Sequence, residues 1–448
     1  MLRTKHMIAL LAFSFLLAVA AGQNLMAQNV PDLEFTEIVA AQRTLVVPDD
    51  FPTIQLAVDN ASESDTVLVR AGTYNESLAI DVSISLIGEG RDCTTLQGES
   101  ESHVITASAD NVTIRGFKIV NGETGPLKIH SGIELINIDY ANIRDNMITG
   151  NFVGISLGDK DRGSHHNIIQ DNIILQNRYG IFMAHSDENT ICGNLVVDSM
   201  WNGIELDWCT LNTVCGNLIA NSTAYGLEIP LETPGSGNIF YHNNFINNTL
   251  KVAVSRYENT WDNGYPFGGN YWDDYHGVDS FSGQNQTDTG SDGIGDKPYT
   301  IDQNNRDSYP LISVIHTFRA PDEAPIYFYL ASNATISDFQ FLPTDPPSLQ
   351  FNAESPHQVP WFCRLTIPRA ILWCDNAWSI FLNETTAEPM ILEDSDNTYI
   401  YFTLDPQMAS NTRVTIVGTG AIPELNIHIV CVLVMVTAAA LSMARNGR

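Results

Sequence analysis

The sequence predicts an all-β protein whose main body is a right-handed parallel β-helix, a solenoid of short stacked strands. Three observations lead to this fold class. A short β-branched motif ending in Asn recurs five times, its closing Asn residues lie 26, 22, 23 and 26 residues apart, and a Gly-Ile or Gly-Leu step follows each of the first four copies. This period leaves no room for a ten-residue helix between strands, so each repeat is expected to form one coil that buries its apolar face against its neighbours.

Each copy of the repeated motif carries an Asn at the same place. The first copy runs from Ala141 to Asn146, and the later copies end at Asn172, Asn194, Asn217 and Asn243. Adjacent rungs of a solenoid lie about 4.8 Å apart, so each amide is expected to bond the Asn above and below it in a ladder. The Gly of the following step supplies a corner conformation that a side chain would hinder. These glycines are Gly154, Gly180, Gly203 and Gly226.

The segments before the regular repeats continue the pattern less strictly. Strand-and-turn units are expected at 65–74, 82–88 and 111–119. The segment 53–60 instead has apolar residues at helical spacing. A short helix there would cover the first rung of the solenoid and block edge pairing.

Both ends of the sequence predict segments that lie outside the folded domains. Residues 1–27 are predicted to be a signal peptide, because a positive start precedes an apolar run and then small residues. The segment 424–448 is predicted to be a transmembrane helix with a cytoplasmic tail, because an apolar run precedes Arg445 and Arg448. The alternative for this run is a buried strand or helix of the last domain. The protein is therefore expected at the cell surface, anchored in the cytoplasmic membrane with its main body outside.

Two domains are predicted between these ends. The solenoid is expected over residues 44–315. Residues 320–420 contain about six short strand-like runs separated by turn residues, a pattern typical of a small β-sandwich.

Charge excludes one class of partner. The chain has 52 acidic and 22 basic residues and a formal charge of −30. This argues against nucleic acid, whose binding needs clustered Lys and Arg, and suits a solvated surface or one that collects cations. Eight Asn-x-Ser/Thr sites could carry glycans on an exported chain.

Several segments resemble the NosD-type β-helix family, also described as the carbohydrate-binding and sugar-hydrolase β-helix domain. They are TIQLAVDNA at 53–61, DTVLVRAGTYNE at 65–76, ISLIGEG at 84–90, and the run from Gly268 through Asp296 to Pro310. The resemblance covers about residues 44 to 312 and implies the fold. It implies no single function, because the family includes binding proteins, polysaccharide enzymes and a copper-delivery factor. The last domain with its terminal anchor resembles the stalks of archaeal surface proteins.

Outward carboxylates are the main candidates for a ligand site. Counting from the Gly-Ile and Gly-Leu steps places Glu205 and Glu228 on neighbouring rungs, roughly 5 Å apart. Asp207, His185 and Trp208 are expected close by. Like charges at this distance are unfavourable unless a proton, a cation or a ligand intervenes. The group is therefore a candidate for binding a glycan, for holding calcium or for acid-base cleavage, and the alternative is a solvated acidic face.

We therefore expect a cell-surface carbohydrate-binding protein without established catalysis, whose partner is a polysaccharide or a cell-surface glycan. The combination used by pectinase-like enzymes, paired Asp with a Gly-His-Gly and a nearby Arg-x-Lys, does not occur in the sequence. A polysaccharide hydrolase or lyase that uses Glu205, Asp207 and Glu228 is the alternative. A structural component of a surface layer is the second alternative.

Copper delivery is disfavoured. Copper sites in proteins are built from His, Met and Cys ligands that lie close together. The best candidates are His165 with His166, and Met183 with His185, and Met183 is expected to point into the core.

Aromatic residues concentrate near the end of the solenoid. Flat rings can stack on sugars, but they can also plug the open last rung, and we favour the plug. The residues are Trp261, Tyr265, Phe267, Tyr271, Trp272 and Tyr275.

Two disulfides are predicted among seven cysteines. Cys192 and Cys215 occupy the same position on successive rungs, within the Cα separation that a disulfide requires. Cys363 and Cys374 could close a hairpin in the last domain. The spacing of the cysteines does not match a zinc site.

A calcium site is predicted in the segment 288–296, which resembles the first nine positions of an EF-hand loop. Asp288, Asp292 and Asp296 would supply carboxylates, and Ile294 would supply its carbonyl oxygen. Gly at position three and Tyr at position twelve depart from the pattern. The alternative is a Gly/Asp-rich turn that uses the same residues for backbone reasons.

Overall fold

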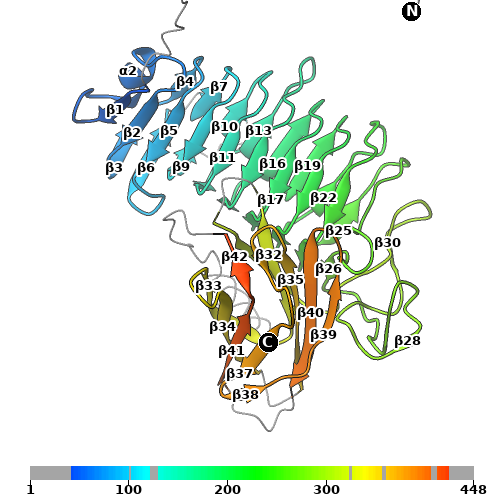
Figure 1. Cartoon of the computed structure of the whole chain (residues 1–448). Coiled ribbons are helices and arrows are strands. Elements are labelled where there is room, and N and C mark those ends of the chain that lie inside the picture. The colour runs from blue at the N-terminus through cyan, green and yellow to red at the C-terminus, as the bar shows by residue number, and fades with distance from the viewer. Residues whose placement is uncertain are drawn as a thin grey trace, which may run out of the picture. The chain divides into compact units, whose positions relative to one another are not determined.

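Three parallel sheets of short strands wind around one apolar core and form a right-handed β-helix (Figure 1). In this computed structural model the described residues are 42–99, 102–121, 130–321, 325–355, 360–404 and 411–422. Two packed antiparallel sheets follow the β-helix. The predicted solenoid and the predicted sandwich-like unit are therefore confirmed.

The solenoid strands belong to three sheets, each in chain order. The first sheet contains β1 (Thr44–Val47), β2 (Thr66–Val69), β5 (Ser85–Gly88), β8 (Thr113–Arg115), β11 (Asn142–Arg144), β14 (Ile168–Gln170), β17 (Thr190–Cys192), β20 (Thr213–Cys215) and β23 (Ile239–Tyr241). The second contains β3 (Gly72–Asn75), β6 (Thr94–Gly98), β9 (Lys118–Asn121), β12 (Met147–Thr149), β15 (Ile173–Leu175), β18 (Leu195–Val197), β21 (Leu218–Ala220), β24 (Asn244–Ile246) and β26 (Tyr271–Trp272). The third contains β4 (Leu78–Ile80), β7 (Ile105–Ala107), β10 (Ser131–Leu135), β13 (Val153–Leu157), β16 (Tyr179–Ala184), β19 (Ile204–Asp207), β22 (Tyr225–Glu228) and β25 (Leu250–Ala253).

Apolar side chains stack in register inside the solenoid. In the first sheet they occupy one column on successive rungs and are fully buried: Ile114, Ile143, Ile169, Ile191 and Val214. Burying one such side chain contributes about 1.5–3 kcal/mol. Because neighbouring residues of a strand point to opposite faces, each inward residue leaves the next one directed outward.

The Asn ladder predicted from the repeats is confirmed. Asn172 Nδ2 donates to Asn194 Oδ1 at 3.0 Å and also to the carbonyl oxygen of Ile143 at 2.8 Å. The same side-chain link repeats from Asn194 to Asn217 at 3.0 Å and from Asn217 to Asn243 at 2.9 Å. Each buried amide is thus paired along the axis, which avoids the cost of leaving a polar group unbonded in the core.

Both ends of the solenoid are closed. Helix α2 (Ile54–Asp59) lies where the sequence predicts a cap, its first turn is capped by the Thr53 side chain, and its Ile54, Ala57 and Val58 are buried. At the other end Trp261 and Trp272 are fully buried and stack on the last core rings, as expected of a plug.

Four very short strands follow the last rung and form two ribbons. They are β27 (Phe281–Ser282) with β28 (Asp288–Thr289), and β29 (Tyr299–Thr300) with β30 (Arg306–Asp307).

The sandwich-like unit consists of two five-stranded antiparallel sheets and one small pair. The first five-stranded sheet has the order β31 (Ile315–Arg319), β32 (Tyr327–Ser332), β35 (Trp361–Pro368), β40 (Asn397–Leu404), β39 (Met390–Glu393). The second has the order β33 (Thr335–Leu342), β34 (Ser348–Glu354), β41 (Asn411–Val417), β37 (Ser379–Leu382), β38 (Thr385–Thr386). The pair is β36 (Leu372–Trp373) with β42 (Gly420–Ala421). The rings of Phe318 and Phe339 stack between the two large sheets, 3.7 Å apart.

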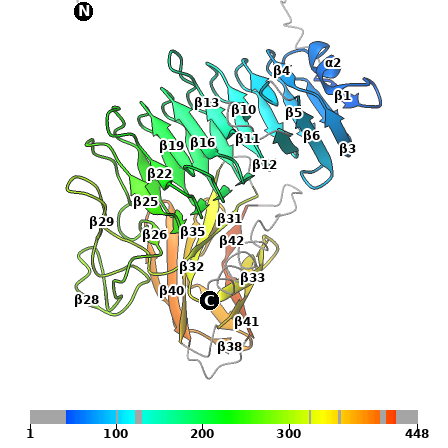
Figure 2. The ribbon, with the colours of Figure 1, turned by 180° about the vertical axis from the view of Figure 1, so that it is seen from behind.

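One outer corner of the solenoid carries the contacts to the sandwich-like unit (Figure 2). We call this corner the docking column and define it by Asp145, Asp171, Gly193, Gly216 and His242, which all have positive φ on successive rungs. Arg319 forms ion pairs with Asp171 at 3.2 Å and with Asp145 at 3.6 Å. The Tyr329 ring lies 4.3 Å from the His242 ring.

A buried arginine makes a further contact between the two units. Arg364, on β35, is 3% exposed and donates through Nη1 to the carbonyl oxygen of Asp292 at 2.6 Å. Its Nη2 donates to the carbonyl oxygen of Pro266.

The predicted signal peptide and C-terminal anchor lie outside the described residues. Within the part of the chain that the structure describes, no helix is both long and apolar enough to span a membrane. The domain boundaries at 44–315 and 320–420 stay predictions.

Candidate functional site

The outward side of the third sheet holds most of the predicted site residues. One outward column passes in register through Thr106, Glu134, Ser156, Phe182, Glu205 and Glu228. The residues on either side of this column, such as Ile204 and Leu206, are fully buried in the core. Glu205 and Glu228 are direct partners on neighbouring strands, the position that the Gly-Ile spacing indicates.

Asn202 joins the two glutamates. Its Nδ2 donates to Glu205 Oε2 at 2.8 Å and to Glu228 Oε2 at 2.6 Å. The two carboxylate oxygens therefore lie at most about 5.4 Å apart, the sum of these two distances. Burial raises the pKa of Glu205 to about 7, the Asn202 hydrogen bond opposes the rise, and the charge of Glu228 adds to it. Around neutral pH one of this pair is thus close to gaining or losing a proton.

Asp207, His185 and Trp208 lie beside this pair. Asp207 pairs with Ala184 on the neighbouring strand, one outward position beyond Glu205. Burial raises its pKa, and the nearby His185 opposes that rise. The rings of His185 and Trp208 stack with centroids 5.5 Å apart, and Trp208 is 45% exposed.

Large rings border the carboxylates on the other side. We call Phe152, Tyr179, Phe182 and Trp201 the aromatic band. The Tyr179 ring lies 5.8 Å from Phe152 and 6.2 Å from Phe182, and Trp201 is 46% exposed. The guanidinium of Arg178 sits 5.0 Å from the Phe152 centroid and 5.7 Å from the Trp201 centroid. The band therefore already holds one cation against its ring faces.

The face extends three rungs further, to Glu134. Its Oε2 lies 3.1 Å from His103 Nε2, and burial raises the pKa of Glu134. Sequence reasoning missed Glu134 because the Gly-Ile alignment began at Gly154. The step Gly132-Ile133 precedes it by one rung, and the same count would have found the residue.

The aromatic band and Asn202 were also missed as site residues. A signal for them exists, because Phe152, Arg178 and Trp201 each stand two residues before the Gly of their rung. Asn202 stands one residue before its Gly. Counting from the Gly of each rung, which locates Glu205 and Glu228, therefore locates these residues as well.

The predicted cysteine pairs differ in outcome. Cys192 and Cys215 form a disulfide with a Cα–Cα distance of 4.7 Å. Cys363 and Cys374 are both free thiols, so the expected hairpin bridge is not formed. Cys363 is fully buried within the long strand β35, where its Sγ contacts Ser332 Oγ, whereas Cys374 follows β36 in a different sheet.

Two of the predicted calcium ligands are engaged with backbone groups. Asp292 Oδ1 accepts from Ile294 N at 3.0 Å, and Asp296 Oδ1 accepts from Ser280 N at 3.0 Å. Asp288 lies on the ribbon strand β28. Across the described ranges no group of three or more His, Cys, Asp or Glu residues is placed to hold a metal ion. The calcium site stays a prediction.

The residues considered for copper are spread over different surroundings. Met183 is fully buried in the core, whereas His185 lies outside on Trp208. His166 stacks on Tyr140, and His165 accepts a hydrogen bond from Asp187 N.

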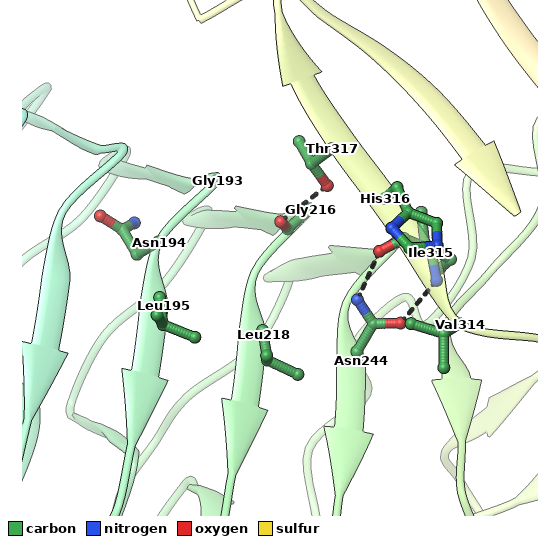
Figure 3. A pocket seen from close by; sticks show the side chains of 10 residues that line it. All are labelled: Gly193, Asn194, Leu195, Gly216, Leu218, Asn244, Val314, Ile315, His316 and Thr317. Carbon is green, nitrogen blue, oxygen red and sulfur yellow. Dashed lines mark hydrogen bonds between the residues drawn. The ribbon is translucent and has the colours of Figure 1, made fainter. Parts of the chain in front are cut away.

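A small cavity of about 50 Å³ lies where β31 meets the docking column (Figure 3). Asn244 exchanges two hydrogen bonds of 2.8 Å with the backbone of Ile315, and Thr317 Oγ1 donates to the Gly216 carbonyl oxygen at 2.9 Å. A space of this size admits a few waters and is far smaller than the usual small-molecule pocket. The cavity therefore belongs to the contact between the two units and not to the candidate site.

The fold and the site define a class: a right-handed parallel β-helix protein with an outward face of carboxylates and aromatic rings. Residues 58–277 match the family described as periplasmic copper-binding protein (NosD), which confirms the predicted resemblance.

Part of the chain is also similar to a cell surface glycoprotein of Methanothermus fervidus. The two are 31% identical over 116 residues, which are 25% of this chain and 18% of that protein. The chain thus matches less than a fifth of the length of this curated relative.

Solved β-helix structures are similar at a lower level. An alginate lyase from Paenibacillus sp. is 16% identical with a TM-score of 0.33, covering 51% of this chain and 97% of the lyase. The periplasmic alginate epimerase AlgG is 16% identical with a TM-score of 0.36, covering 48% of this chain and 54% of the epimerase. Likenesses of this size say nothing about what this chain binds.

Proposed function

We propose that this protein binds a glycan on the outward face of the third sheet. The observation that carries the proposal is the pair of half-exposed indole rings, Trp201 and Trp208, which precede and follow strand β19 with its Asn202-bound Glu205. Exposed rings that gather on one face, rather than standing singly, mark a surface that another molecule covers.

The chemistry of the face suits a sugar chain. Indole and phenol rings can cover the apolar faces of sugar rings, while carboxylates accept hydrogen bonds from hydroxyl groups. A new rung arrives about every 4.8 Å along the axis, so an extended glycan lying along the axis would meet the same kinds of side chain repeatedly.

Retention of the purified chain on a panel of immobilised polysaccharides tests this proposal. Trp201→Ala and Trp208→Ala should each weaken retention about tenfold, because each removes one stacking surface. Phe281→Ala is the matched control, since Phe281 is also a half-exposed ring but lies on the ribbon strand β27. Equal retention of all three variants would show that the outward face of the third sheet does not bind the polysaccharide.

Cleavage of the glycan is a second candidate, favoured by the geometry of the Glu205–Glu228 pair. Retaining glycosidases hold two carboxyl groups about 5–5.5 Å apart, one of them with a raised pKa. The limit of about 5.4 Å between the two oxygens allows this spacing, and the Glu205 pKa of about 7 meets the second condition. New reducing ends or unsaturated products that vanish with Glu205→Gln would establish cleavage. Retention without products would leave binding alone, and neither would point to a structural role.

We also propose that the chain is exported and held at the cell surface by residues 424–448. The similarity of one segment to a cell surface glycoprotein supports the location. The terminal apolar run supports the anchor. Deleting residues 424–448 should move the protein from the membrane fraction to the medium, and an unchanged distribution would reject the anchor.

A further inference from the structure

The glycan-binding face is strongly unbalanced in charge. It carries four carboxylates, Glu134, Glu205, Asp207 and Glu228. Cationic side chains around the face already have partners within the described part of the chain, among them His185, which stacks on Trp208. Arg178 lies over the Phe152 and Trp201 rings, His103 contacts Glu134, and Lys251 on the next rung pairs with Asp273 at 2.7 Å.

The Asn202 bridge leaves half of each glutamate available. Asn202 Nδ2 bonds only the Oε2 atoms of Glu205 and Glu228. Among the described residues no hydrogen bond reaches the Oε1 atom of either side chain. Two carboxylates in direct register repel each other, and a cationic donor between them would relieve that repulsion. An ammonium group, with three donors and no acceptor, can bond both free oxygens at once.

The aromatic band supports a cation independently of the carboxylates. Arg178 shows that the ring faces of Phe152 and Trp201 take a positive group at 5.0 and 5.7 Å. Trp201 is 46% exposed even with this contact in place. A second positive group approaching the glutamates would therefore pass over ring faces that attract it.

We propose that the preferred ligand is a glycan with free amino groups, and that glycans rich in uronic acid are rejected. The inference rests on the proposed function and narrows its ligand class. An amino sugar places its ammonium between the free oxygens of Glu205 and Glu228, while its ring lies on the aromatic band. A uronate brings a third negative charge to the same point, which like-charge repulsion opposes.

Ligand binding should also change the protonation of the site. Burial raises the pKa of Glu205 to about 7. An ammonium beside it favours the ionised carboxylate, so binding near pH 7 should release protons to the buffer.

Calorimetry with four oligosaccharides of equal length tests the inference on the full chain. The set comprises β-1,4-linked glucosamine, its N-acetylated form, a cello-oligosaccharide and an oligogalacturonate. We expect the glucosamine oligomer to bind about tenfold more tightly than the two neutral oligomers, as charge-assisted bonds to two carboxylates require. The oligogalacturonate should bind most weakly of the four.

Two double substitutions separate the effect of the Glu205–Glu228 pair on affinity from the effect of the protein's overall charge. Glu205→Gln with Glu228→Gln should lower the affinity for the glucosamine oligomer about tenfold and leave the cello-oligosaccharide unchanged. Glu63→Gln with Glu99→Gln removes the same charge from two exposed positions outside the face and should change neither.

The outcomes distinguish this inference from the function on which it rests. If none of the four oligomers binds, the proposed function fails and the inference fails with it. If the neutral or uronate oligomer binds as tightly as the glucosamine oligomer, the proposed function stands and the inference is wrong. An equal loss in the control variant, or a loss of binding with a chelator, would also overturn it.

Discussion

The docking column and the proposed glycan-binding face are built from the same repeat, yet one is covered by protein and the other is open. In the docking column the positions that the sandwich-like unit approaches hold Asp, Gly or His. On the open face the corresponding positions hold Trp, Tyr, Phe and Glu. The solenoid backbone therefore does not decide which surface takes a partner. The size and charge of the outward residues decide it.

Close packing explains why the docking column needs its glycines. A Cβ on Gly193 would lie 3.0 Å from the Tyr327 ring, and one on Gly216 would lie 3.0 Å from Thr317 and the Tyr329 ring. Such contacts are tighter than side chains normally accept. The repeat has Gly at these two positions, and the missing side chains leave room for Tyr327 and Tyr329 to pack against the docking column.

The largest expected effect comes from Arg364→Met, which would break the contact between the units. The change leaves the Asp292 and Pro266 carbonyl oxygens unpaired and removes the cation that opposes the raised pKa of Asp292. We expect the free energy of unfolding to fall by about 3–5 kcal/mol, the usual cost of removing one partner of a buried charged pair. Denaturant unfolding with two spectroscopic probes measures it.

An exposed arginine of the same unit provides the control for this prediction. Arg369 forms an ion pair with Glu393, and both side chains are more than a third exposed. Arg369→Met should cost less than about 1 kcal/mol. Equal losses in the two variants would mean that Arg364 does not hold the units together.

A smaller loss of stability should distinguish a glycine in the docking column from a glycine at a turn that no other residue covers closely. Gly216→Ala places a side chain at positive φ and against the Tyr329 ring, whereas Gly150→Ala has the same kind of φ but no atom closer than 3.8 Å. Both variants bear about 1 kcal/mol of backbone strain. We expect Gly216→Ala to lose about 1–2 kcal/mol more for overpacking. Equal melting temperatures would show that the contact at Gly216 is loose.

The sequence predicts the covered corner and the open face to different degrees. The repeat fixes the rungs, the ladder and the neighbouring positions of Glu205 and Glu228, because these depend only on a period of short strands. Extending the same count would have revealed Glu134 and Trp201. The contact of Thr317 with Gly216 joins residues 101 positions apart, and no local pattern reports such a pair.

The predictions of a calcium loop and of a second disulfide show the same limit. The segment 288–296 has the residue types of a calcium loop, and the sequence cannot show that Arg364 comes from a distant strand to lie beside Asp292. Likewise Cys363 and Cys374 are close in sequence, but the intervening turn sends them to different sheets.

The pH dependence of folding stability should report on Glu205 of the open face even without a ligand. The Glu205 pKa is about 7 in the folded protein and about 4.5 ordinarily. Between these values the folded state binds more protons than the unfolded state, so stability falls as the pH rises from about 4.5 to about 7. Solvent screening at this partly exposed group reduces the loss to about 1–2 kcal/mol. Melting temperatures of the unmodified protein and Glu205→Gln at pH 5 and pH 8 test this, and parallel changes in the two would contradict it.

The smallest expected effect is that of calcium on the loop beside the docked unit. Asp292 and Asp296 already accept backbone hydrogen bonds, and Arg364 already places a positive charge near Asp292. A calcium site occupied at a hundred times its Kd would stabilise the fold by about 2.7 kcal/mol, so binding would be easy to detect. We expect calcium to shift the melting temperature of the unmodified protein by less than about 1 °C, and to shift that of Arg364→Met more, because that variant leaves the Asp292 charge uncompensated. A saturable calcium heat in the unmodified protein that disappears in Asp292→Ala would instead establish the site predicted from the sequence, and would make this loop a second place where the protein collects cations.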